Sequence, residues 1–247
     1  MAAADPAWRY SRILLKLSGE ALAGNQGFGI EGATLVSLAR EIGSIHAAGI
    51  SIGVVIGGGN FFRGMSAAAA DMDRVTADYI GMLATVMNGL ALNQALEQQG
   101  IPARIQSALV ISSIVEPFVR ARALKHLQNG RVVIFAGGTG SPLFTTDSAA
   151  SLRAIEIDAE LMVKGTRVDG VYDADPAHNP DAVRYDTLTY EQVLNRNLKV
   201  MDATAITLCR DHDMPIRVLN IQQAGNLLEA ARGRAVGTLV HRSGDIT

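Results

Sequence analysis

The stretch Ile13-Leu14-Leu15-Lys16-Leu17-Ser18-Gly19 joins an apolar run to a lysine and a small, glycine-containing turn. Two later stretches also lead from an apolar run into a glycine-rich turn, one ending in Gly57-Gly58-Gly59-Asn60 and the other running from Gly137-Gly138-Thr139-Gly140 to Thr145-Thr146-Asp147. Glycine lets backbone N–H groups approach an anion closely, and a following helix N-terminus adds a favourable dipole. These three turns have basic residues near or beyond them, namely Lys16, Arg63, Lys164 and Arg167. The pattern indicates that several phosphates are held at once, as phosphoryl transfer requires.

Six short apolar runs are expected to be strands: residues 13–15, 50–56, 131–135, 161–163, 216–219 and 239–240. Their lack of polar alternation is typical of strands buried on both faces, as in a parallel sheet covered by helices. Helical apolar stripes over residues 35–45 and 72–90 lie between them. With right-handed crossovers, this order predicts an α/β fold, a three-layer α/β/α sandwich with a mainly parallel open sheet. Ligands of such a fold bind at the carboxyl ends of strands, where the glycine turns fall.

Residues 168–172, Val-Asp-Gly-Val-Tyr, place a turn dipeptide between two β-formers, and Pro176 and Pro180 follow. Proline makes continued helix unfavourable, so we expect a protruding hairpin and loop here. The chain of 247 residues is long enough for one large α/β domain, and no linker or repeat divides it. We therefore expect a single domain over residues 9–247, preceded by an N-terminal extension of residues 1–8.

Charge and composition exclude several classes of function. The 22 basic and 24 acidic residues are interspersed, and without a basic stripe we expect no nucleic-acid partner. The lone Cys209 excludes an internal disulfide framework, and residues 1–10 lack the apolar core of a signal peptide. No run approaches the roughly 20 uninterrupted apolar residues of a membrane span, so we expect a cytoplasmic protein with no membrane partner.

Familiar nucleotide-binding motifs do not occur in the sequence. It contains no G-x-x-x-x-G-K-[ST], and neither residues 57–62 nor residues 138–143 complete G-x-G-x-x-G. The H-R-D and D-F-G motifs of protein kinases are also missing from it. The five histidines have no paired ligand spacing and are assigned no chemistry. A different phosphate-binding fold is therefore expected.

Individual residues of the turns allow more than one interpretation. Lys16 could be a solvated lysine at a strand end, but Ser18-Gly19 beside it favours a cation that reaches phosphates held by the loop. Three successive glycines at 57–59 are entropically unfavourable for packing alone, which favours close backbone approach to phosphate. From the residues alone, Asp78 is interpreted as a solvated carboxylate on a helix. Three roles are open for Asp147: it could cap the helix that follows it, orient the strand-end lysines, or contact the ligands of a bound Mg²⁺ without binding the ion itself.

Six ordered blocks resemble the bacterial UMP kinases, a branch of the amino acid kinase family. They are KLSGEAL (16–22), VVIGGGNFFRG (54–64), GMLATVMNGLAL (81–92), GTGSPLFTTDSAA (138–150), KGTRVDGVYDADP (164–176) and LKVMDATA (198–205). The resemblance covers essentially everything from Arg9 to Val240. It implies the amino acid kinase fold and reversible transfer of the ATP γ-phosphoryl group to UMP, giving UDP and ADP, with Mg²⁺. The direct Mg²⁺ ligands are not assigned, because the nucleotide phosphates are expected to hold most of the ion.

The resemblance also implies residue roles, with UMP bound by the N-terminal part of the domain and ATP by the C-terminal part. The implied catalytic residues are Lys16, Lys164, Asp147 and Arg63, with Arg63 between the two nucleotides. ATP phosphates are assigned to Lys16, Leu17, Ser18, Gly19 and Gly59, and the adenosine part to Thr166, Tyr172 and Asp175. UMP is assigned to Gly58, Asp78, Thr139, Gly140, Ser141, Pro142, Leu143, Phe144, Thr145 and Thr146, which replaces the solvated interpretation of Asp78.

The resemblance further implies a homo-oligomer, most often a hexamer, activated by GTP and inhibited by UTP. The implied GTP-responsive loop is Gly24, Asn25, Gln26, Gly27, Phe28 and Gly29. The apolar character of residues 75–92 independently favours burial of one helix face against a neighbouring subunit. Two departures from the family pattern are Gly137, where alanine is frequent, and Glu31, where aspartate is frequent.

Two other functions remain as alternatives, since fold does not fix function. One is a non-catalytic nucleotide-binding or storage protein on the same fold, against which the joint presence of Lys16, Asp78, Asp147 and Asp175 argues. The other is a related kinase of a carboxylate or carbamate. Residues 139–147 argue against it, because a small acyl substrate has no base to recognise.

Overall fold

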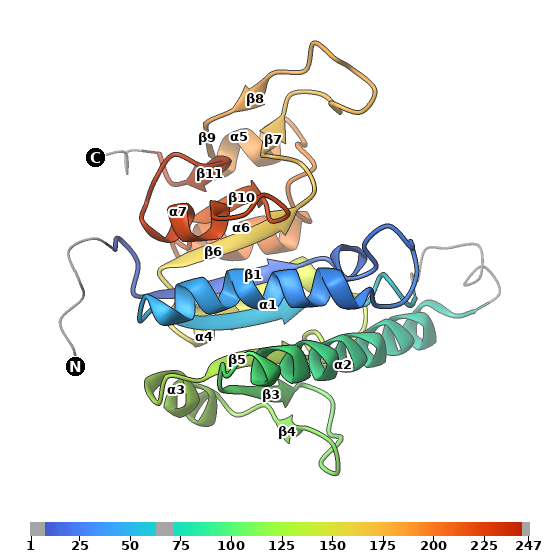
Figure 1. Cartoon of the computed structure of the whole chain (residues 1–247). Helices are drawn as coiled ribbons and strands as arrows, with labels where there is room; N and C mark the ends of the chain where they lie inside the picture. The colour runs from blue at the N-terminus through green and yellow to red at the C-terminus, as the bar shows by residue number, and fades with distance from the viewer. Residues whose placement is uncertain (1–7, 63–71, 244–247) are drawn as a thin grey trace.

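A nine-stranded sheet runs through the computed structural model, which describes residues 8–62 and 72–243 (Figure 1). The strand order is β4-β3-β5-β2-β1-β6-β10-β11-β9, and every neighbouring pair is parallel except β10 with β11. The strands are β1 (Arg12–Leu17), β2 (Ser51–Ile56), β3 (Ala103–Ser107), β4 (Glu116–Pro117), β5 (Val132–Ala136), β6 (Leu161–Thr166), β9 (Thr187–Thr189), β10 (Ile216–Asn220) and β11 (Thr238–His241). The predicted open, mainly parallel sheet is confirmed.

Strand alternation divides the core into two layers, one on each face of the sheet. In β1, Ile13, Leu15 and Leu17 belong to one buried cluster, whereas Leu14 belongs to the other. Successive side chains of a strand point to opposite faces, so Lys16 shares its face with Leu14. The same alternation in β6 puts Lys164 on the face of Met162. Both lysines therefore point into the same layer of helices.

Helices cover both faces of the sheet. On one face lie α1 (Gly32–Ala47), α2 (Arg74–Gln98) and α7 (Asn226–Ala231), and α1 and α2 cross the near side in Figure 1. On the other lie α3 (Arg120–Gln128), α4 (Thr146–Glu156), α5 (Tyr190–Asn195) and α6 (Ala203–Asp211). A short 3-10 helix, η1 (Gly19–Ala21), follows β1. The predicted three-layer α/β/α sandwich is thus confirmed.

The helix α2 has one buried and one exposed apolar face. Met82 and Val86 are buried in the molecule. Along the opposite side runs an exposed stripe, the α2 outer stripe, made of Val75, Tyr79, Leu83, Met87 and Leu90. Among the described residues, α2 alone is long and apolar enough to cross a membrane by length and composition, and it packs on the sheet as a core helix does.

The predicted hairpin exists, but its turn was placed wrongly. The strand β7 (Val171–Tyr172) pairs antiparallel with β8 (Arg184–Tyr185), so the connection is the long segment 173–183 rather than Asp169-Gly170. Side chains explain the difference, because Thr238 Oγ1 accepts the Val171 N–H over 2.8 Å and Asp169 accepts the Tyr172 hydroxyl over 2.5 Å. The first bond holds Val171 against β11, and the second closes residues 169–172 on themselves. The strands β7 and β8 and their loop project from the body in Figure 1.

Candidate active site

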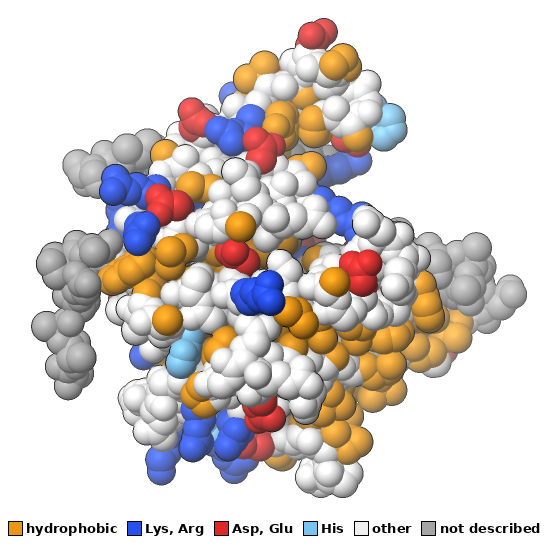
Figure 2. All heavy atoms as spheres, viewed as in Figure 1, with side chains coloured by type: hydrophobic (Ala, Val, Ile, Leu, Met, Phe, Trp, Pro, Cys, Tyr) orange, Lys and Arg blue, Asp and Glu red, His pale blue; other side chains and the backbone are white. Residues whose placement is uncertain are grey.

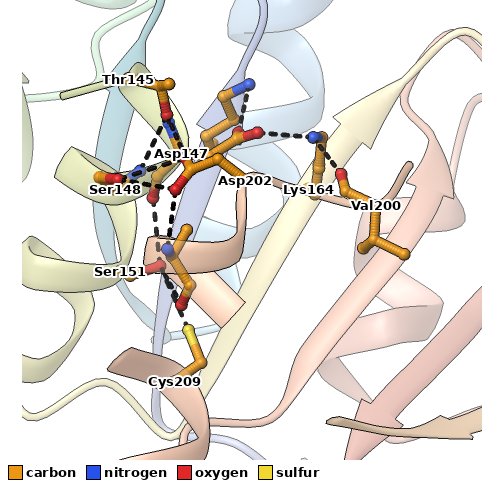
Figure 3. A network of polar contacts seen from close by, with 10 residues as sticks. Thr145, Asp147, Ser148, Ser151, Lys164, Val200, Asp202 and Cys209 are labelled. Atoms are coloured by element: carbon orange, nitrogen blue, oxygen red, sulfur yellow. Dashed lines mark hydrogen bonds and ion pairs between the residues drawn. The ribbon is translucent and has the colours of Figure 1, made fainter. Parts of the chain in front are cut away.

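Two lysines and one aspartate meet at the carboxyl ends of the central strands. Lys16 of β1 and Lys164 of β6 are paired in the parallel register. Asp147, in the first turn of α4, lies between them: its Oδ1 is 2.7 Å from Lys16 Nζ, and its Oδ2 is 2.9 Å from Lys164 Nζ (Figure 3). The three side chains are only 10%, 16% and 15% exposed for Lys16, Lys164 and Asp147. We call these residues the lysine–aspartate cluster.

The start of α4 shows why Asp147 is available to the lysines. The helix is capped by Thr145, whose hydroxyl accepts the N–H groups of Asp147 over 3.0 Å and Ser148 over 3.2 Å. Of the interpretations left open for Asp147, the geometry therefore favours contact with the lysines over capping. A carboxylate in the first turn also gains from the helix dipole.

Burial and charge oppose one another in the cluster. Burial raises the pKa of Asp147, but the charges of Lys16 and Lys164 outweigh it, and the pKa lies below its usual range. Burial lowers the pKa of Lys164, and the neighbouring Lys16 adds to this, while Asp147 acts in the opposite direction without restoring the usual value. With all three groups charged, the cluster keeps one excess positive charge. That charge is suited to an anionic phosphate in a water-poor site.

Asp202 joins α4 to α6 behind the cluster, a link that the sequence analysis did not assign. It caps α6 by accepting the Ala205 N–H over 2.9 Å, and it also accepts hydrogen bonds from the hydroxyls of Thr145 and Ser148 (Figure 3). The sequence feature that could have identified Asp202 is the stretch Asp-Ala-Thr-Ala at residues 202–205, because an aspartate is a common cap at the start of a helix. Lys164 in turn donates to the carbonyl of Val200, just before this cap.

A first pocket, of about 220 Å³, opens beside the cluster between the second and third glycine turns and α2. Seven of the residues assigned to UMP line it: Gly58, Asp78, Thr139, Ser141, Phe144, Thr145 and Thr146. Gly140, Pro142 and Leu143 do not line it, and Gly59, which the resemblance assigned to ATP phosphates, does. Arg63, which the resemblance places between the two nucleotides, lies outside the described residues.

Asp78 is held in place at the first pocket and is not a freely solvated carboxylate. Its Oδ2 accepts the Leu143 N–H over 2.8 Å, and its Oδ1 lies 2.8 Å from Nε of Arg74. The side chain is 15% exposed. Arg74, which was not predicted as a site residue, lines the same pocket four residues before Asp78. A spacing of four residues on a helix brings two side chains together, and this spacing could have identified Arg74 as a partner of Asp78.

Glycine at the second turn is needed for close packing, and not only to let backbone N–H groups approach a phosphate. A Cβ atom on Gly58 would lie 2.5 Å from the Gly81 carbonyl oxygen of α2. A Cβ on Gly19 would lie 2.6 Å from the Gly57 carbonyl oxygen and 2.8 Å from the Gly59 nitrogen. The first two turns therefore pack backbone to backbone, and packing explains part of the glycine pattern that was attributed to phosphate approach.

A second pocket, of about 410 Å³, lies on the other side of the cluster, under β7 and the projecting loop. Lys164 lines it together with Thr166, Tyr172 and Asp175, the three residues assigned to adenosine. Lys199, Leu198 and Arg196 line it too and were not assigned. Lys164 lines the second pocket and Thr146, next to Asp147, lines the first, so the cluster lies between the two pockets.

The remaining residues assigned to ATP phosphates follow Lys16 at the end of β1. Leu17 is buried in the core, and Ser18 Oγ accepts the Glu20 N–H over 3.3 Å at the start of η1. Leu17, Ser18 and Gly19 line neither pocket. They border the same sheet edge, where β1 lies between β2 and β6.

The loop 24–29 is anchored to the second glycine turn. Gly29 and Asn60 exchange backbone and side-chain hydrogen bonds, with Gly29 N donating to Asn60 O over 3.0 Å and Asn60 Nδ2 donating to Gly29 O over 2.8 Å. The rings of Phe28 and Phe61 meet edge to face, 5.8 Å between centroids. Glycines at positions 24, 27 and 29 have positive φ, which other residues rarely adopt.

The amino acid kinase family matches residues 11–220, and the chain belongs to this family. Among solved structures, the UMP kinase of Bacillus anthracis is 40% identical with a TM-score of 0.92, covering 95% of this chain and 97% of that one. The UMP kinase of Ureaplasma parvum is 38% identical with a TM-score of 0.88, covering 95% and 100%. The uridylate kinase of Archaeoglobus fulgidus is 28% identical with a TM-score of 0.70, covering 92% and 99%.

Proposed function

We propose that this protein is a UMP kinase, which transfers the γ-phosphoryl group of ATP to UMP and gives UDP and ADP. The observation that carries the proposal is the lysine–aspartate cluster between two pockets, the smaller of which is lined by six residues of the G-T-G-S-P-L-F-T-T-D stretch. The similarity to two UMP kinases over nearly the whole chain supports it.

In this proposal the N-terminal part of a single domain binds UMP in the first pocket, and the C-terminal part binds ATP in the second. Asp78 accepts ribose hydroxyls of UMP, and Thr139 to Thr146 surround its base. Tyr172 contacts the adenine ring and Asp175 the ribose of ATP. Arg63, outside the described residues, is proposed to lie between the two nucleotides.

The cluster acts by position and charge. Lys16 and Lys164 neutralise negative charge on the γ-phosphoryl group as it passes in line to an oxygen of UMP phosphate, while Asp147 holds both Nζ atoms in place. A general base is unnecessary because the acceptor phosphate, whose second pKa is about 6, is already ionised at neutral pH. No residue forms a covalent bond to the transferred group.

The residues of the site fit a magnesium ion held mainly by the nucleotide. No group of three or more His, Cys, Asp or Glu side chains in residues 8–62 and 72–243 could hold a metal ion, and both oxygens of Asp147 face lysines. Mg²⁺ is commonly bound by substrate phosphates and water with few protein ligands. When bound, it would neutralise charge on the ATP phosphates.

A homo-oligomer, a hexamer in our proposal, is supported by the α2 outer stripe. Figure 2 shows hydrophobic side chains gathered over this helix, where Val75, Tyr79, Leu83, Met87 and Leu90 are 38% to 49% exposed. Contiguous exposed apolar surface of this kind is typical of protein interfaces. We further propose activation by GTP through the loop 24–29, inhibition by UTP, and a cytoplasmic location.

A coupled assay of ADP formation across UMP, CMP, AMP and GMP tests the function. We expect UMP to be strongly preferred, because a site that hydrogen-bonds one base edge leaves its own groups unpaired with another base. Comparable kcat/KM for UMP and CMP would contradict the specificity. Binding of UMP and ATP without any ADP formation would instead favour the non-catalytic alternative.

A further inference from the structure

Two buried side-chain amides form a reciprocal pair beneath the triple-glycine turn. Asn60 Nδ2 donates to Asn88 Oδ1 over 2.9 Å, and Asn88 Nδ2 donates to Asn60 Oδ1 over 2.7 Å. Their exposed fractions are 1% for Asn60 and 0% for Asn88. Buried amides without partners are strongly unfavourable, so a pair that satisfies itself in this way fixes the geometry of both side chains.

The remaining bonds of the pair go to backbone carbonyls at two neighbouring segments. Asn88 Nδ2 donates to Gly57 O over 2.7 Å, at the point where β2 ends and the triple-glycine turn begins. Asn60 Nδ2 donates to Gly29 O over 2.8 Å. The pair thus ties the turn to α2 on one side and to the loop 24–29 on the other.

The same helix holds the third glycine turn in a similar way. Thr85 of α2, one turn before Asn88, accepts the Gly137 N–H on its hydroxyl over 2.7 Å. Its hydroxyl also donates to the Met82 carbonyl over 2.6 Å, which fixes its direction. α2 therefore sets the positions of both glycine turns that border the first pocket.

We propose that Asn88, paired with Asn60, is a positioning residue that fixes the backbone of the triple-glycine turn for the phosphate group of UMP. Neither amide lines either pocket, whereas Gly58 and Gly59 line the first. Three successive glycines allow many backbone conformations, so their N–H groups converge on one phosphate only if other contacts hold the turn. A donor arrangement fixed before binding saves the free energy of ordering it during binding.

This inference rests on the proposed function, and the experiment separates the two. UMP and uridine differ only in the phosphate, so their dissociation constants are measured by calorimetry for the wild-type chain and for Asn88→Ala. We expect UMP to bind about tenfold more weakly to Asn88→Ala, the factor for loss of about 1.4 kcal/mol, and uridine to change by less than about twofold.

The matched control is Asn93→Ala, which removes an amide from the same helix. Asn93 Oδ1 has no hydrogen-bond partner among the described residues, and we expect its replacement to change neither constant. Asn60→Ala should repeat the loss for UMP, and the double variant should lose no more than either single one, because both amides act as one unit. Asn88→Ser, which leaves a smaller cavity, is used if Asn88→Ala does not fold.

The outcomes are distinct. Equal loss of UMP and uridine affinity in Asn88→Ala, or no loss at all, would overturn the positioning role. A wild-type chain that binds neither UMP nor ATP would overturn the proposed function instead. Retained uridine binding also shows that the variant is folded.

Discussion

The Nζ atom of Lys16 lies 2.7 Å from Oδ1 of Asp147, and both side chains are almost completely removed from water. The carboxylate holds the lysine at the strand end before any nucleotide binds. Because a second lysine shares the same carboxylate, the attraction does not cancel the positive charge of the cluster. The arrangement is thus a fixed cation in a low-dielectric site, the condition under which charge stabilisation is most effective.

Replacement of Lys16 by methionine should leave the fold intact and lower kcat by on the order of 10²- to 10³-fold, since it removes one charge contact to the transition state. Thermal unfolding and steady-state kinetics check the two parts separately. If kcat stays near the wild-type value while Tm is unchanged, Lys16 is only a lysine at a strand end.

Replacement of Asp147 by asparagine should destabilise the protein by several kcal/mol, because two buried lysines lose their shared counter-charge. The folded-state pKa of Asp147 lies below the ordinary value of 3.8, so its contribution is present above that pH and is lost as pH falls through the lower folded value. Urea unfolding between about pH 6 and about pH 2 should show a gap between wild type and Asp147→Asn that is constant down to the ordinary value of 3.8 and narrows below it. A gap that does not depend on pH would contradict this linkage.

Replacement of Asp78 by asparagine should raise KM for UMP by about tenfold and leave KM for ATP within about twofold, because only the first pocket contains this carboxylate. Steady-state titration of each nucleotide at saturating partner measures both values. Equal increases for UMP and ATP would show that the substitution disturbs the whole site.

Cys209 should resist alkylation in the folded protein. Burial raises the pKa of its thiol to about 11, so at about pH 8 only about 0.1% is thiolate. The folded group holds its proton above the ordinary value of 9.0, and its contribution to stability is therefore present below that pH and is lost as pH rises from 9.0 towards 11. Mass spectrometry after iodoacetamide treatment, with and without urea, checks the protection, and rapid labelling without urea would contradict it.

Replacement of Leu83 by glutamate should weaken assembly, because Leu83 stands in the middle of the α2 outer stripe and is 48% exposed. Light scattering at micromolar concentration measures the change. The matched control is Val110→Glu, on a residue that is 79% exposed and lies outside α2. A wild-type chain that is monomeric would refute the assembly proposal and leave the kinase assignment untouched.

Apolar runs identified the central strands because these strands are buried on both faces. The strands β3, β4 and β9 were missed, since Arg104 and Gln106 interrupt the apolar run of β3, and β4 and β9 have only two and three residues. Eight residues that line the first pocket were assigned to a nucleotide through the family resemblance. Arg74, which lines the same pocket, and Asp202, which bonds to Thr145 and Ser148, were not assigned, because their partners lie on other elements or one helical turn away. Side-chain bonds to backbone, as at Val171, decided the hairpin turn and leave no periodic pattern in the sequence.

The helix α2 carries Asp78 at the first pocket, Thr85 and Asn88 at two glycine turns, and an apolar stripe on its outer side. An α-helix turns by about 100° per residue, so one residue inserted or deleted between Asp78 and Asn88 would rotate the later contacts away from the earlier ones. The first pocket, the two glycine turns and the α2 outer stripe thus all require the same number of residues in this segment. We therefore expect relatives to differ in residue type but not in residue number between positions 78 and 88. Differences in length should fall in connections such as 173–183 instead.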